Sequence, residues 1–105
     1  MAYKFTLLSD SLANRRKFIT CWRGITEFFK SDCGALGSRL HGGTGGVFFG
    51  YAQWPSEEIK DAAGEVLPSE DFVKLRMEWA KLCGPSEIIF AGRVIEDMLI
   101  AHDIR

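Results

Sequence analysis

Hydrophobic and polar residues alternate at the start of the chain, which is the pattern of a β-strand. Within residues 3–9, the apolar residues Tyr3, Phe5 and Leu7 occupy every second position, and the polar residues Lys4 and Thr6 lie between them. The polar residues that follow Leu8, among them Ser11, are suitable helix caps. We therefore expect a first strand over residues 3–9 and a helix directly after it.

The following segment changes to helical spacing. Over residues 12–31, large apolar side chains recur at steps of four, three and four, and the basic residues fall elsewhere on the helical wheel. Gly34 is expected to end this amphipathic helix. The recurring apolar residues are Phe18, Trp22, Ile25 and Phe29.

Two apolar segments of strand length, residues 35–41 and 47–54, flank a run of four glycines and one threonine. A phosphate-binding loop leads into a helix and usually has a lysine after it, whereas a strand and no lysine follow this run. We therefore expect residues 42–46 to form the loop of a β-hairpin.

The second half of the chain predicts one further helix and one further strand. The acidic residues 57–64 are expected to form either a short helix or an irregular excursion. The segment 69–83 begins with a capping serine and two carboxylates, and Gly84 and Pro85 end it, so a helix is predicted there. Residues 87–101 are rich in branched apolar residues and are predicted to be the last strand.

This order of elements, strand, helix, strand, strand, helix, strand, is that of an α+β ferredoxin-like fold. It predicts a four-stranded antiparallel sheet with both helices on one face. With 105 residues the chain is expected to be one domain, 1–105. The third strand is apolar on both of its faces, so we expect either a second copy of the chain or a ligand to cover the face without helices.

The composition limits the classes of partner. The chain is 47% hydrophobic, and its 13 basic and 14 acidic residues give a net charge of −1, which provides no general attraction to nucleic acid or to anionic lipid. Residues 46–51 are similar in outline to the aromatic strand of RNA-recognition domains but have no leading lysine or arginine. We expect a cytoplasmic protein with no nucleic-acid or membrane partner, because neither a signal peptide nor a membrane span is evident.

The cysteines and histidines give no metal-binding pattern. The three cysteines, Cys21, Cys33 and Cys83, lack the spacing of metal ligands, and the histidines are His41 and His102. We expect free buried thiols and no bound metal.

Two segments and one helix residue carry a resemblance to a known family. Residues 34–41 form a glycine-led second strand, residues 51–58 end the third strand in Trp54 and lead into a Ser-Glu helix start, and Phe72 lies in the next helix. Together these features resemble the antibiotic biosynthesis monooxygenase domain. The resemblance implies a dimeric α+β barrel, in which two sheets pack face to face and each subunit has a pocket between its sheet and its helices.

The resemblance also implies an activity. Some members of this family oxidise phenols or quinols without a cofactor, because the electron-rich substrate itself supplies electrons to oxygen. Heme-degrading members use a helix histidine, a strand-one asparagine and a strand-three tryptophan, of which this sequence has only Trp54. We therefore expect no cofactor, a small aromatic phenol or quinol as substrate, and a homodimer. The alternative is a dimeric small-molecule-binding protein without catalysis.

The candidate site residues follow from these expectations. Aromatic side chains on the helices and the third strand are expected either to pack in the core or to enclose a flat aromatic ligand. His41 is the candidate proton acceptor unless it is simply exposed at the hairpin, and Arg39 either faces the ligand or pairs with a carboxylate. The aromatic candidates are Trp54, Trp22, Trp79, Phe18, Phe48 and Phe72.

Overall fold

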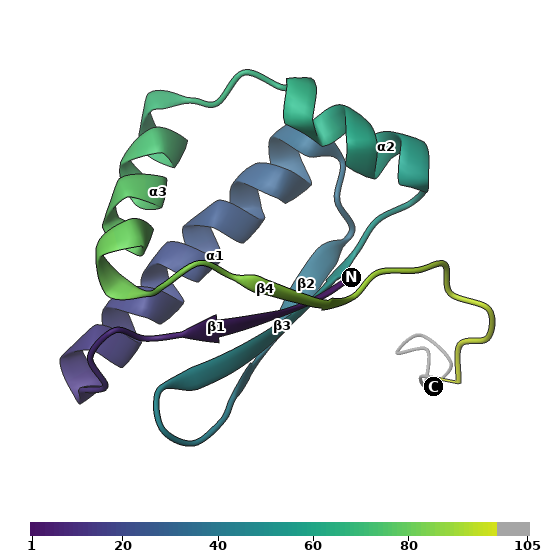
Figure 1. The fold of residues 1–105 in the computed structure, drawn as a ribbon. Helices are drawn as coiled ribbons and strands as arrows, with labels where there is room; N and C mark the ends of the chain where they lie inside the picture. The colour runs from purple at the N-terminus through teal and green to yellow at the C-terminus, as the bar shows by residue number, and fades with distance from the viewer. Residues whose placement is uncertain (99–105) are drawn as a thin grey trace, which may run out of the picture.

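The order of the strands determines where the helices and the candidate site lie. In the computed structural model, which describes residues 1–98, a four-stranded antiparallel sheet has the order β2-β3-β1-β4, and helices cover one face (Figure 1). The predicted α+β ferredoxin-like fold is therefore confirmed. The elements in chain order are β1 (Ala2–Thr6), α1 (Leu12–Cys33), β2 (Gly37–Gly42), β3 (Val47–Gln53), α2 (Glu57–Ala62), the 3-10 turn η1 (Ala63–Glu65), α3 (Glu70–Leu82) and β4 (Glu87–Phe90).

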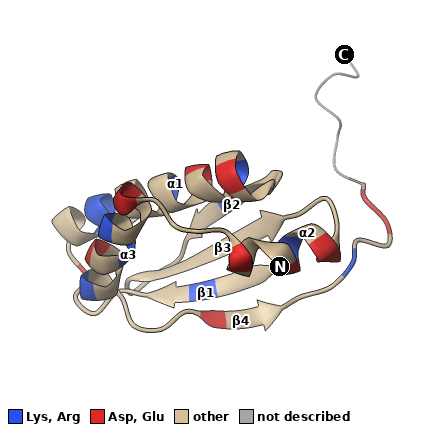
Figure 2. Ribbon diagram, turned by 90° about the horizontal axis from the view of Figure 1, so that it is seen from above, with Lys and Arg blue, Asp and Glu red and all other residues tan. Residues whose placement is uncertain are grey.

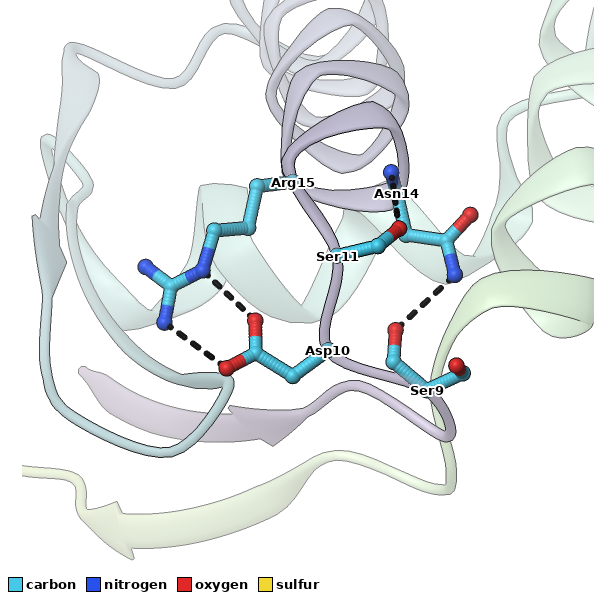
Figure 3. Close-up of polar contacts among 5 residues, drawn as sticks. All are labelled: Ser9, Asp10, Ser11, Asn14 and Arg15. Atoms are coloured by element: carbon cyan, nitrogen blue, oxygen red, sulfur yellow. Dashed lines mark hydrogen bonds and ion pairs between the residues drawn. The ribbon is translucent and has the colours of Figure 1, made fainter.

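Side-chain hydrogen bonds fix the start of α1 (Figure 3). The hydroxyl of Ser11 accepts a hydrogen bond from the backbone N–H of Asn14 at 3.1 Å, and the Asn14 side chain donates to the Ser9 carbonyl at 2.9 Å. Arg15 contacts both carboxylate oxygens of Asp10, at 2.6 and 3.4 Å. This ion pair lowers the pKa of Asp10, and it ties the first turn of the helix to the loop that precedes it.

The other helix boundaries also follow from local sequence. Gly34 ends α1 with φ of +81°, a left-handed conformation that favours glycine. Ser69 caps α3 by accepting a hydrogen bond from the Phe72 N–H at 3.1 Å. Ser56 caps α2 through the Ile59 N–H at 3.2 Å, so the acidic segment forms a short helix followed by a 3-10 turn. The first of the two alternatives for residues 57–64 is therefore confirmed.

The core is built around Phe18 of α1, whose side chain is completely buried. Its ring lies 4.5 Å from the Phe48 ring of β3 and 4.5 Å from the Trp79 ring of α3, measured between centroids. Phe5 of β1 completes the cluster at 5.7 Å. One side chain therefore joins both long helices to the central strands of the sheet.

The two long helices also approach closely at Gly24. A Cβ atom at this position of α1 would lie 2.6 Å from Cδ1 of Leu75 in α3, well inside van der Waals contact. The absence of a side chain at Gly24 therefore leaves room for the Leu75 side chain where α1 and α3 pack together.

The strand register separates the two faces of the sheet. Phe48 and Gly50 of β3 face the helices, as their contacts with Phe18 and Trp22 show. Phe49 and Tyr51 face the opposite side, which we call the open face, and Tyr51 contacts the Phe90 ring at 6.0 Å. Both faces of β3 are thus apolar, as the sequence predicts.

The open face is apolar at its centre and carries few charges. Lys4 and Glu87 pair across β1 and β4 at 3.9 Å. Figure 2 shows a blue band on β1 beside a red band on β4, on a sheet that is otherwise largely uncharged. Most of the charged residues lie on the helices (Figure 2). Phe49 is 39% exposed and Phe90 is 55% exposed, so the described residues leave this surface without a cover.

The last strand is shorter than predicted. β4 spans Glu87–Phe90, and residues 91–98 contain no strand, so the prediction of a strand over 87–101 is wrong for 91–98. Residues 99–101 lie outside the described residues. Phe90 pairs with Ala2, where β1 begins, and a longer β4 would therefore have no partner in β1. The β propensity of residues such as Val94 and Ile95 is not enough to form a strand without that partner.

The three cysteines are free and buried, as expected. Burial raises the pKa of all three thiols, that of Cys83 to about 11. Among residues 1–98, no helix combines the length and the apolar character that a membrane span requires.

Candidate functional site

A cavity of about 780 Å³ lies between the helix-side face of the sheet and the helices. We call it the central cavity. Its volume falls within the usual range of about 300–1,000 Å³ for small-molecule sites. Its lining is rich in aromatic rings contributed by β1, α1, α3 and the segment that ends β3. These rings are Tyr3, Phe5, Trp22, Phe28, Phe29, Trp54, Phe72 and Trp79.

Aromatic contacts hold the wall of the central cavity nearest to α2. Phe28 of α1 stacks on Phe72 of α3 with 4.0 Å between ring centroids. Phe29 meets the Trp54 ring edge to face at 5.9 Å and the Phe72 ring at 5.8 Å. Edge-on and stacked rings of this kind present flat apolar surfaces, and they are suited to a planar aromatic ligand.

A few polar groups interrupt this apolar lining. The Tyr3 hydroxyl donates a hydrogen bond to the sulfur of Met1 at 2.8 Å, and burial raises the pKa of Tyr3, so the phenol is protonated at neutral pH. Sulfur is a weak acceptor, which leaves the hydroxyl available to a stronger one. Ser38 donates to the Tyr51 carbonyl at 2.8 Å.

Charged side chains reach the central cavity from α2 and α3. Lys60 and Arg76 line it, together with the carboxylate of Asp61. The guanidinium carbon of Arg76 lies 5.8 Å from the centroid of the Phe72 ring, a cation–π distance. With two cations and one carboxylate, the charged lining favours a ligand that is anionic or becomes anionic.

Four of the predicted aromatic residues come together in the central cavity: Trp22, Trp54, Trp79 and Phe72. Two do not reach its lining. Phe18 is completely buried and Phe48 is 4% exposed, and they stack on each other in the core. The register explains the position of Phe48, because it lies opposite Phe5 directly beneath the helices.

Arg39 and His41 lie away from the central cavity. They are opposite Tyr51 and Phe49 in the β2–β3 ladder, so they belong to the open face. Both line a second depression of about 590 Å³ at the edge of the sheet, between α1 and β2, which we call the edge groove. Trp22, Thr26, Gly37 and Ser38 line both, so the edge groove adjoins the central cavity.

Several lining residues were not among the sequence predictions. Tyr3 could have been found, because the alternation of the first strand places it on the same face as Phe5. Arg76 follows Phe72 by four residues and so shares its helix face. No sequence pattern indicated that Lys60 lines the cavity, because residues 57–64 were expected to form either a short helix or an irregular excursion.

Comparisons with known proteins identify the fold but not the family. No family model matches the sequence, and a search of curated proteins finds no match. The structure is similar to that of SnoaB, a cofactor-independent oxygenase from Streptomyces nogalater, at 14% sequence identity with a TM-score of 0.64. A mutant of SnoaB gives 13% identity and a TM-score of 0.65. Each match covers 91% of this chain and 94% of the other chain. At such identity the similarity establishes a shared fold.

Proposed function

We propose that this chain is a cofactor-independent, monooxygenase-like protein of the antibiotic biosynthesis monooxygenase family, and that it acts on a small aromatic phenol or quinol. The observation that carries the proposal is the central cavity, whose aromatic walls and cationic side chains suit such a molecule. The fold shared with a cofactor-independent oxygenase supports the reaction class.

The chemistry requires no external reductant. An anthrone-type phenol gives up the two hydrogens of its ring methylene and gains a carbonyl oxygen from O₂, and the second oxygen atom leaves as water. Four electrons pass from the substrate to oxygen. The protein has to bind the substrate, orient it and favour its ionised form, which reduces oxygen more readily.

We assign these tasks to residues that line the central cavity. Trp54 and Phe72 hold the aromatic rings of the substrate. Lys60 and Arg76 lower the pKa of a bound phenol by stabilising its anion. Tyr3, which is protonated at neutral pH, donates a hydrogen bond to the developing negative oxygen. His41 lines the edge groove instead, and we assign it no role in this cavity.

We also propose that two copies of the chain pack through their open faces. The exposed rings of Phe49 and Phe90 support this arrangement, because soluble monomers rarely leave a large apolar patch in water. Sedimentation at micromolar concentration should report a particle of twice 11.8 kDa. A single species of 11.8 kDa would remove support for the dimer.

Oxygen consumption tests the catalytic proposal. Purified protein, freed of metal and flavin, is mixed with a panel of hydroquinones and anthrone-type phenols in an oxygen electrode. We expect at least one compound to consume one O₂ for each molecule of product. Trp54→Ala and Tyr3→Phe should each lower the rate by about tenfold or more, the usual scale for one binding or hydrogen-bonding group in a reaction. Val73→Ala, at an exposed position of α3, is the matched control and should leave the rate unchanged.

A second candidate function is ligand binding without chemistry. It is favoured by one observation: among the described residues, the lining of the central cavity contains no imidazole. Calorimetry with the same compounds distinguishes the two functions. Binding that Trp54→Ala weakens, with no oxygen consumed by any compound, would identify a binding protein. If no compound binds or reacts, neither function stands.

A further inference from the structure

The edge groove adjoins the central cavity, but the cations Arg23, Lys30 and Arg39 line the groove alone. Its floor is β2 and the neighbouring part of β3, and its wall is one face of α1. Arg23, Glu27 and Lys30 follow one another at steps of four and three along α1, so they lie on the same helix face and all line the groove. Nothing in the proposed oxygenase chemistry uses this groove.

β2 is an edge strand with unused hydrogen-bonding groups. Ala52 donates its backbone N–H to the Met1 carbonyl, on the side of β1, at 2.8 Å. Consecutive residues of a strand direct their backbone N–H and C=O groups to opposite sides of the strand. Tyr51, next to Ala52, therefore directs its N–H and C=O toward β2, where it pairs with Arg39. The same alternation directs the backbone N–H and C=O of Ser38 and Leu40 to the free edge. No strand of the described chain lies beside that edge.

Cations flank this free edge on both sides of the sheet. Arg23 and Lys30 lie on the helix side, where Glu27 forms an ion pair with Lys30 at 3.9 Å. Arg39 lies on the side of the open face, at the rim of the surface through which we propose that two copies pack. In a strand placed beside β2, alternate side chains would point to the two sides, so each set would meet a positively charged residue.

From this arrangement we propose that the edge groove binds an acidic, extended peptide segment of another protein, which adds to the sheet as a strand beside β2. Backbone hydrogen bonds to Ser38 and Leu40 provide affinity, and the cations on both sides select acidic side chains. β2 has six residues, so a segment of similar length fills the groove.

The charges favour an acidic partner over a second copy of the chain. Two β2 strands paired edge to edge would bring Arg39 of each copy, and the cations of each α1, into the same region. Such repulsion between like charges disfavours that pairing. A Lys- or Arg-rich segment is disfavoured for the same reason.

Fluorescence polarisation with a labelled peptide tests the proposal. The probe is an eight-residue, fluorescein-labelled peptide in which glutamate and valine alternate. We expect binding that weakens as salt is raised, and no binding of a peptide with lysine in place of glutamate. A third peptide, with its internal amides N-methylated, should also fail to bind, because it keeps the charges but loses the backbone donors.

Variants locate the binding to the groove. Arg23→Glu and Arg39→Glu each reverse one charge on one side of β2 and should each raise the Kd by about fivefold or more. Lys74→Glu, an exposed cation of α3, is the matched control and should leave the Kd unchanged. Because Arg23 and Arg39 are both exposed, thermal unfolding should confirm that these variants fold.

Four results would overturn the proposal. The first is equal binding of the N-methylated peptide, which would show attraction by charge alone. The second is an unchanged Kd in both groove variants, and the third is equally tight binding of a single-stranded oligonucleotide. The last is slow hydrogen exchange at the Ser38 and Leu40 amides before any peptide is added, which would show that another copy already occupies the edge.

Discussion

Replacing Phe18 with alanine removes the side chain on which the core is centred. Its ring is completely buried and lies 4.5 Å from Phe48, 4.5 Å from Trp79 and 5.7 Å from Phe5. These three rings come from β3, α3 and β1, so no single neighbour can move to fill the space. We therefore expect Phe18→Ala to leave a cavity that only partly collapses.

The size of the effect can be worked from this geometry. A buried phenyl side chain removes about 150–250 Å² from water, which at about 25 cal/mol per Å² corresponds to roughly 4–6 kcal/mol. Alanine recovers a part of this area and is a better helix former by a few tenths of a kcal/mol. The expected loss is about 3–5 kcal/mol, a large share of the roughly 5–15 kcal/mol that stabilises a domain of this size.

Urea denaturation followed by tryptophan fluorescence measures this loss. The midpoint should fall strongly while the slope with urea concentration stays the same, because the surface exposed on unfolding hardly changes. Ile19→Ala is the control, since Ile19 is the next residue of α1 and is 36% exposed. Should Phe18→Ala cost less than about 1 kcal/mol, or no more than Ile19→Ala, the description of the core would be refuted.

Three further predictions concern caps and a thiol. Ser11→Ala removes the cap on α1 and should cost about 1 kcal/mol in the free energy of unfolding, measured with urea, whereas Ser31→Ala at an exposed position near the other end of α1 should cost less. Gly34→Ala places a side chain at φ of +81° and 3.3 Å from Ile59, so thermal unfolding should show a loss of about 1–2 kcal/mol or more; an unchanged melting temperature would contradict this conformation. The third concerns Cys83, for which burial, with a smaller contribution from Cys21, raises the pKa from its ordinary 9.0 to about 11 in the folded protein. Because the folded state holds this proton more tightly than the unfolded state, the contribution of the thiol to the free energy of unfolding is fully present below pH 9 and is lost as the pH rises from 9 to 11. Cys83→Ala should flatten that part of the plot of stability against pH. Identical plots for the variant and the unchanged protein would argue against a protected thiol.

The local pattern of the sequence was sufficient for most of the fold. The amphipathic spacing around Phe18 and the caps at Ser11 and Ser69 are short-range signals, and the helices begin where these signals place them. The last strand was different, because the length of β4 depends on where β1 begins, and no residue within 87–101 carries that information.

The candidate site was predictable only in part, for a related reason. The tryptophans were recognised from type and spacing, and all three reach the central cavity. The position of His41 depends on the β2–β3 register, in which a shift of one residue moves every side chain to the opposite face. The alternation along β3 places Phe48 on the face that the helices cover, but whether a residue on that face lies in the core or in a cavity depends on how the helices pack above it.

The packing of α1 against α3 at Gly24 has a consequence for the cavity beneath these helices. Neither Gly24 nor Leu75 lines the central cavity, yet they meet where α1 and α3, which both contribute lining residues, lie close together. A methyl group added there would have to displace the Leu75 side chain or move α1 and α3 apart, with every residue that lines the cavity unchanged. The packing of the helices above the cavity can therefore be altered from a position outside its lining.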